Sequence, residues 1–132
     1  MTETIDLLKR VWDLTNNERR QHQLPDLTFN WELAWAAMKH SANMANQDFF
    51  DHRDLENRVR SEGYQGSVGE NIYAGGSTAE AVVNGWMDSP GHRDNILNPQ
   101  YREIGVGYFF LENDPGSLNY RYYWTQIFGI PR

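Results

Sequence analysis

The chain has 132 residues, which fits one domain (residues 1–132) with a core large enough to fold without covalent cross-links. The absence of cysteine excludes a disulfide framework, a cysteine nucleophile and thiolate metal sites, but it leaves the compartment open. The formal net charge of −6 argues against nucleic acid or an anionic membrane as the main partner. No apolar stretch approaches the ~20 residues of a transmembrane helix, so we expect no membrane span.

The first third of the chain has helical periodicity. Apolar residues recur every three to four positions over residues 3–22, and Leu24-Pro25 ends that segment because proline cannot continue a helix. Residues 26–29 are expected to form a linker. Asn30 is a suitable N-cap for a second helix over about residues 31–47, and the small residues on its buried stripe indicate close packing against a neighbour.

A short third helix is expected next. Asp51 is placed to cap it, Leu55 and Val59 would lie on its buried side, and the glycine-containing segment 61–66 would end it. Both histidines of the preceding helical segments, His22 and His40, are expected to bond to backbone rather than to a ligand.

The middle of the chain contains one extended segment and a further helix. Residues 68–74 are short and mixed, as in a minor strand. Ser77 to Glu80 has the spacing of a capping box, which predicts a helix start. Pro90-Gly91 stops this helix, and one or two further turns follow over residues 92–97.

The last third changes to the alternating period of strands, over residues 104–111 and again over 120–127. Both faces of these strands are apolar, so the sheet should be covered on both sides. The expected fold class is therefore α+β, a three-layer α-β-α sandwich in which helices cover both faces of a small antiparallel sheet.

Three residues form the one chemically suggestive group. Glu70 and His92 stand in turn-like, glycine-flanked segments, and His52 lies upstream. Two imidazoles and a carboxylate can hold Zn²⁺ and leave a position open to water, or the carboxylate can act as a general base. The alternative is that each histidine caps a turn or bonds to backbone.

The order of short motifs along the chain resembles the CAP superfamily, which contains cysteine-rich secretory proteins, insect venom antigens and plant pathogenesis-related proteins. The resemblance is to its short bacterial branch without cysteines and covers nearly the whole chain. The motifs are Asn17-Glu18-Arg19, His40-Ser41, Phe50-Asp51-His52, Gly69-Glu70-Asn71-Ile72, Trp86 to Arg93, Asn95-Ile96-Leu97, Ile104-Gly105-Val106-Gly107 and Trp124 to Phe128.

This resemblance implies the same α-β-α sandwich, with a central cleft in which two histidines and two acids can hold a divalent cation. His52 and His92 match the two histidines, and Glu70 matches the first acid. The position of the second acid is occupied by Ser89, and Asp88 is the nearest acidic residue. A cation such as Zn²⁺ would therefore be weakly bound by an incomplete set.

Three functions follow from the resemblance. The first is a binding module, expected to be a secreted or cell-envelope monomer, that takes a peptide, lipid or protein in the cleft and a divalent cation on His52, Glu70 and His92. The second is a metal-dependent hydrolase of peptides or cell-wall material, with Glu70 as base. The third is a metal-free lipid or sterol groove, in keeping with the aromatic content of 14%. The acidic, polar start of the sequence is unlike a signal peptide, so a cytoplasmic protein stays an alternative.

Overall fold

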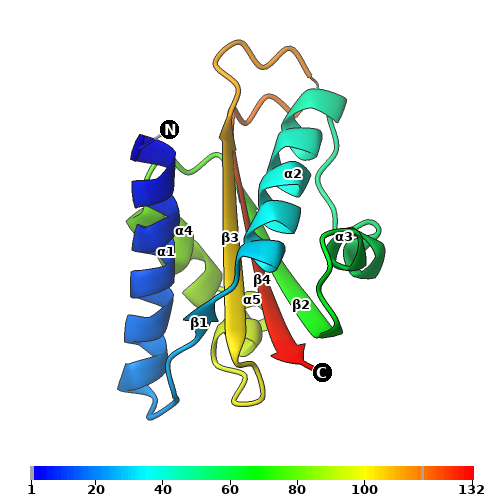
Figure 1. Ribbon diagram of the computed structural model, residues 1–132. Helices are drawn as coiled ribbons and strands as arrows, with labels where there is room; N and C mark the ends of the chain where they lie inside the picture. Colours follow the sequence, from blue (N-terminus) through cyan, green and yellow to red (C-terminus); the bar gives the residue numbers. More distant parts are fainter. Residues whose placement is uncertain (1, 117) are drawn as a thin grey trace.

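A computed structural model describes residues 2–116 and 118–132. Within these residues the helices and strands follow one another along the chain as Figure 1 shows. They are α1 (Thr2–Gln21), β1 (Thr28–Phe29), α2 (Trp31–Gln47), α3 (Leu55–Ser61), β2 (Gly66–Ala74), α4 (Ala79–Met87), α5 (Pro90–Ile96), β3 (Glu103–Phe110) and β4 (Tyr122–Pro131).

The strands form one sheet in the order β1-β3-β4-β2. The three longer strands are antiparallel, as expected, but β1 runs parallel to β3, so the sheet is mixed. The expected linker at residues 26–29 therefore contains an edge strand. Two residues are too few to show a period in sequence, and their strand character comes from backbone bonds to Arg102 and Ile104.

Helices cover both faces of this sheet. Figure 1 shows α2 and α3 on one side and α1 with α4 and α5 on the other. The α1 side contains the largest apolar core cluster, and two smaller clusters lie under α2 and α3. The predicted three-layer α-β-α sandwich is confirmed.

Helix α2 lies unusually close to the sheet. The Asn30 side chain accepts a hydrogen bond from the Leu33 N–H at 2.9 Å, which confirms the predicted cap. A Cβ atom at Gly105 or Gly107 would collide with the backbone of α2 at Ala34 or Ala37. These two glycines of β3 therefore allow the direct approach that the small residues of α2 indicated.

Two predicted caps were wrong. Asp51 accepts from the Arg53 N–H two residues on, which forms a local turn, and α3 starts only after Asp54. At α4, Thr78 rather than Ser77 accepts the capping bond, and Glu80 pairs with Arg10 at 2.9 Å instead of closing a capping box. In both cases the carboxylate, of Asp51 or of Glu80, bonds to a nearby arginine or backbone group instead of capping the helix.

Strand β4 starts later and ends later than residues 120–127. Asn119 and Arg121 have positive φ angles of 51° and 70°, which interrupt an extended chain before Tyr122. The strand then continues to Pro131 because it pairs with the whole of β2.

None of the helices in the described part of the chain is long and apolar enough to cross a membrane.

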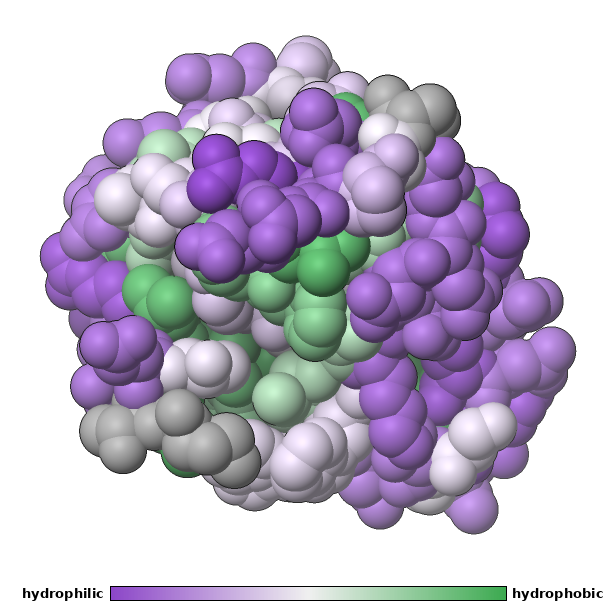
Figure 2. All heavy atoms as spheres, turned by 90° about the horizontal axis from the view of Figure 1, so that it is seen from above, coloured by the Kyte–Doolittle hydropathy of each residue, from purple (hydrophilic) through white to green (hydrophobic). Residues whose placement is uncertain are grey.

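One end of the molecule carries an apolar hollow. This end, at the top of Figure 1, holds the start of α1 and the loop between β3 and β4. Seen from above, apolar residues gather near its middle and hydrophilic residues surround them (Figure 2).

Candidate functional site

The site is organised by two consecutive residues of β2 that point to opposite faces of the sheet. Successive side chains of a strand alternate between its faces. Glu70 bonds to Arg58 of α3, whereas Asn71 bonds to Asn95 of α5. The edge of β2 is covered here, because the Asn95 amide and the Trp86 indole donate to the carbonyls of Glu70 and Ile72.

The carboxylate of Glu70 is buried and has polar partners on both oxygens. Its side chain is only 1% exposed. Arg58 Nη1 donates to Oε2 at 2.9 Å, Arg58 Nη2 donates to Oε1 at 3.1 Å, and His52 Nδ1 lies 2.8 Å from Oε1. This is a two-pronged arginine–carboxylate pair with an added imidazole, the strongest type of charge-assisted bonding in proteins.

These contacts set the ionisation of the group. Burial alone would raise the pKa of Glu70, but the hydrogen bonds from His52 and Arg58 outweigh it, so the pKa is lowered. The hydrogen bond to Glu70 raises the pKa of His52. At neutral pH Glu70 is therefore ionised, and His52 is protonated more readily than a free imidazole.

His40 is buried next to Glu70 and His52 and bonds to the backbone of the segment that precedes His52. Its ring is 1% exposed, its Nε2 lies 2.7 Å from the Asp51 carbonyl and 3.9 Å from Glu70 Oε1, and burial lowers its pKa. It thereby holds the chain segment that carries His52. His22 contacts the Glu18 carbonyl at 2.9 Å, so backbone bonding is confirmed for both His22 and His40.

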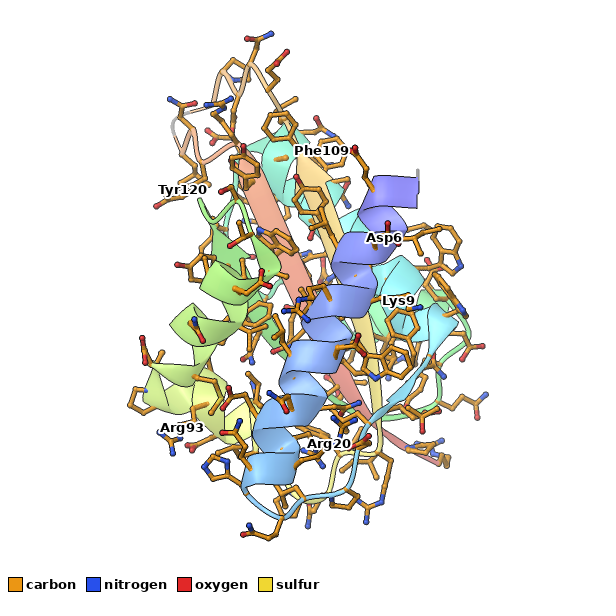
Figure 3. All side chains as sticks on the ribbon, turned by 90° about the vertical axis from the view of Figure 1, so that its left-hand side faces the viewer. Asp6, Lys9, Arg20, Arg93, Phe109 and Tyr120 are labelled. Carbon is orange, nitrogen blue, oxygen red and sulfur yellow. The ribbon has the colours of Figure 1, made fainter. Side chains whose placement is uncertain are left out.

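His92 approaches from the other face of the sheet. It lies in the first turn of α5, and its backbone carbonyl accepts from Asn71 at 3.0 Å. Its Nδ1 is 2.9 Å from the hydroxyl of Ser89, so the residue at the expected acid position orients the ring instead. Arg93, the next residue, points outward from α5, away from α1 (Figure 3). Burial, and then the charge of His52, lower the pKa of His92.

Behind His92 lies a neutral network. Asn71 donates to Gln126 Oε1 at 2.9 Å and accepts from Asn95 at 2.9 Å, and Gln126 donates to Thr15 of α1 at 3.1 Å. Asn71, Gln126 and Thr15 are fully buried. These amides fix the register between β2, β4 and the helices without any charge.

Asp88 stays outside both networks. It is exposed and follows α4 as its C-cap residue. In residues 2–116 and 118–132, no hydrogen bond or ion pair joins it to His52, Glu70 or His92. The structure thus brings His52 to Glu70 and places His92 nearby, but it does not bring Asp88 to them.

The predicted ligands do not fit a three-ligand metal centre in this arrangement. No three His, Cys, Asp or Glu side chains of the described residues are placed to hold a metal ion. Both oxygens of Glu70 are bound to Arg58, and the Nδ1 atom of His52 faces the same carboxylate rather than an open position. A fixed positive charge therefore lies where the carboxylate would meet a cation.

Sequence reasoning missed Arg58, the main partner of Glu70. A signal was available, since a buried carboxylate needs a cationic partner. The short helix predicted just before β2 contains two arginines, Arg58 and Arg60, and Arg58 alone reaches inward. Nothing in the local spacing distinguished the two.

An open pocket lies beside this cluster. It has a volume of about 530 Å³ and is lined mainly by polar and charged side chains of α3 and the segment before it, with His52 at one wall and Val68 of β2 at another. A neighbouring depression shares Arg60 and Val68 and extends along the start of β2 to Arg132. His52, whose side chain is 51% exposed, is the member of the cluster that faces this surface.

Fold and site together define a domain of the CAP type. Residues 12–128 match the family described as the cysteine-rich secretory protein family, CAP, and the chain belongs to this family. It is 39% identical over 126 residues to the uncharacterised protein YkwD of Bacillus subtilis and 36% identical over 106 residues to the uncharacterised membrane protein YlbC of the same organism. These matches cover 91% and 75% of this chain but only 46% and 30% of those relatives.

Solved structures of other proteins have the same fold as this chain. An extracellular protein containing a SCP domain from Bacillus anthracis is 32% identical, with a TM-score of 0.80 over 96% of this chain and 41% of that one. An outer surface protein from Borrelia burgdorferi has a TM-score of 0.81 at 17% identity, covering 94% of this chain and 92% of that one, which shows the shared fold alone.

Proposed function

We propose that this chain is a binding domain that takes a peptide or protein segment beside His52 and does not turn it over. The observation that carries this proposal is the orientation of His52. Its Nδ1 is fixed by Glu70 at 2.8 Å, while its ring stands half exposed at the wall of an open pocket. A preoriented imidazole costs little ordering entropy when a ligand binds.

The lining of the pocket favours a peptide over a lipid. Asp54, Glu56 and Arg60 provide both signs of charge, and Leu55 and Val68 provide apolar surface. The amide groups and charged ends of a peptide can form hydrogen bonds and ion pairs with such a polar lining. A lipid tail would leave these charged groups without partners.

Hydrolysis with Glu70 as base is the weaker candidate. A general base must have a lone pair within hydrogen-bond reach of the proton that it removes. Both carboxylate oxygens already accept bonds from Arg58 and His52, and the pKa of Glu70 is lowered, which makes it a poorer base. A divalent cation such as Zn²⁺ on the Nε2 atoms of His52 and His92 stays a prediction.

A metal-free lipid groove has one observation in its favour. The apolar hollow in Figure 2 lies at the end of the molecule with the β3–β4 loop, and Phe110 and Tyr120 are among the exposed aromatic residues of that region. We rank it second, because the half-exposed His52 ring lies at the wall of the polar pocket.

We further propose that the domain acts outside the cytoplasm, at the cell envelope or in secreted form. The support is the 32% identical extracellular protein of Bacillus anthracis.

The test is an NMR titration of the labelled domain with defined acidic, basic and neutral tetrapeptides. We expect at least one peptide to shift the signals of His52, Leu55 and Val68, and His52→Ala to weaken that binding about tenfold. Mass spectrometry of the same mixtures should find the peptides intact. Peptide cleavage that stops in Glu70→Gln would establish the hydrolase instead, and shifts confined to the β3–β4 end with fatty acid would favour the lipid groove.

A further inference from the structure

We propose that Arg58 is a built-in cation that takes the place of a metal ion at Glu70 and makes this site selective against divalent cations. This inference goes beyond peptide binding and does not depend on it. It concerns which ions the cluster admits, and it assigns Arg58 as the residue that determines this.

The first support is the completeness of the contacts that Arg58 makes. Its Nη1 and Nη2 bind the two oxygens of Glu70, and its Nε donates to the Arg53 carbonyl at 2.9 Å. All three guanidinium nitrogens are therefore engaged, and the plane of the group is fixed from two directions. The match between a planar fork and a carboxylate is the geometry for which arginine is suited and lysine is not.

The second support is burial. The Glu70 side chain is 1% exposed and that of Arg58 is 15% exposed, so water screens the pair only weakly. A divalent cation that approached Glu70 would have to displace the guanidinium or lie beside it. Displacement would leave a nearly buried arginine without a partner, and coexistence would place like charges together in a poorly screened setting.

The third support is the state of His52. Its Nδ1 contacts the same carboxylate oxygen that Arg58 Nη2 binds, so carboxylate and imidazole satisfy each other. A metal ion bound to Glu70 itself would need this contact broken, whereas an ion bound to Nε2 of His52 would leave it in place. With Arg58 present, a cation can bind only to separate imidazole rings and not to a carboxylate and an imidazole together.

Removal of the charge should therefore create metal affinity. We would titrate ZnCl₂ by calorimetry at pH 7 into the wild-type chain, Arg58→Gln and Arg58→Lys. Arg58→Gln frees Glu70 and should bind zinc at least about tenfold more tightly than the wild type. Arg58→Lys retains the charge and should stay within about threefold of the wild type. Equal affinity of the wild type and Arg58→Gln, or an equal gain in Arg58→Lys, would overturn the proposal.

A double variant shows whether the added zinc affinity arises at Glu70. Arg58→Gln/Glu70→Gln should lose the added zinc affinity, and a gain that survives in it would mean that zinc binds elsewhere, which contradicts the proposal. Circular dichroism and thermal melting establish that each variant is folded before it is titrated.

A measurement on the wild type keeps the proposal testable even if Arg58→Gln unfolds. The ¹⁵N signals of the Arg58 guanidinium, followed by NMR while ZnCl₂ is added, should keep the positions of a group paired with Glu70, whereas signals of exposed histidines are free to move. A zinc-dependent release of the Arg58 guanidinium from Glu70 in the wild type would overturn the proposal. Peptide binding beside His52 is measured separately, so its failure and the failure of this inference are distinguishable.

Discussion

Glu70 and Asn71 are neighbours in β2, yet they belong to two different kinds of polar network. Glu70 joins Arg58 and His52 in a charged group that is half open to solvent through the His52 ring. Asn71 joins Gln126 in a neutral group in which both side chains are fully buried. One strand thus separates a titratable network under α3 from a network under α5 that has no charge.

The difference indicates how the two networks divide their roles. A buried network of amides has no pKa, so its contribution to stability does not change with pH, and it serves to hold one arrangement of strands and helices. A charged network at the rim of a pocket responds to pH and to ligands. His92 connects the two, because its backbone carbonyl accepts from Asn71 and its pKa is lowered by the charge of His52 after burial.

The largest effect is expected from breaking the neutral network. Asn71→Leu removes three hydrogen bonds, to Gln126, to the His92 carbonyl and from Asn95, and it leaves the fully buried Gln126 Oε1 without its donor. We expect a loss of about 3–5 kcal/mol in the free energy of unfolding. Urea denaturation at several pH values should give the same loss throughout. The exposed Asn84 is the matched control, and Asn84→Leu should change stability by less than about 0.5 kcal/mol.

A smaller, pH-dependent effect is expected from breaking the charged network. Glu70→Gln leaves Arg58 nearly buried without a carboxylate, which should cost about 2–4 kcal/mol near pH 6. The lowered pKa of Glu70 means that its contribution is present above its ordinary value of 4.5 and is lost as the pH falls through the native pKa. The raised pKa of His52 adds stability that is complete below 6.5 and is lost as the pH rises through the native pKa.

The gap in stability between the wild type and Glu70→Gln should therefore be widest between about pH 4.5 and 6.5. Urea denaturation across pH 3–8 measures it. The surface pair of Arg10 with Glu80, whose side chains are about half exposed, provides the control, and Glu80→Gln should cost less than about 1 kcal/mol. A gap that is the same at every pH would contradict the assignment of Glu70 as an ionised group.

The smallest effect is expected at the point where the two networks meet. Ser89→Ala removes the hydroxyl that contacts His92 Nδ1 at 2.9 Å. Because Ser89 makes no side-chain capping bond to α5, the loss should be about 1 kcal/mol or less. The sharper readout is the His92 imidazole, whose NMR signals should broaden as the ring loses its fixed orientation. Unchanged His92 signals in Ser89→Ala would mean that Ser89 does not orient the ring.

The sequence predicted those parts of the fold that are expressed in local periodicity. The α2 helix, its Asn30 cap and the alternating strands could be read directly, and the three-layer sandwich followed from them. Strand β1 could not be read, because its two residues become a strand only through pairing with β3. The Asp51 and Ser77 caps failed because neighbouring donors and acceptors competed for the same groups.

For the candidate site, sequence reasoning found the residues but not their relation. His52, Glu70 and His92 were identified, and the structure places His52 against Glu70. The partner that decides the chemistry of Glu70 was missed, because the rotation of a seven-residue helix determines which arginine points inward. The neutral network was missed for a related reason: Asn71 and Gln126 are far apart in sequence, and only the register of β2 on β4 joins them.

Glu70 is an ionised partner of His52 and Arg58 in this structure. The most direct test is an NMR titration of the histidine side chains in the wild type and in Glu70→Gln. We expect His52 to titrate above 6.5 and His92 and His40 to titrate below it in the wild type. We also expect the pKa of His52 to fall in Glu70→Gln. A His52 pKa at or below 6.5 in the wild type, or one that Glu70→Gln leaves unchanged, would contradict the pairing of an ionised Glu70 with His52.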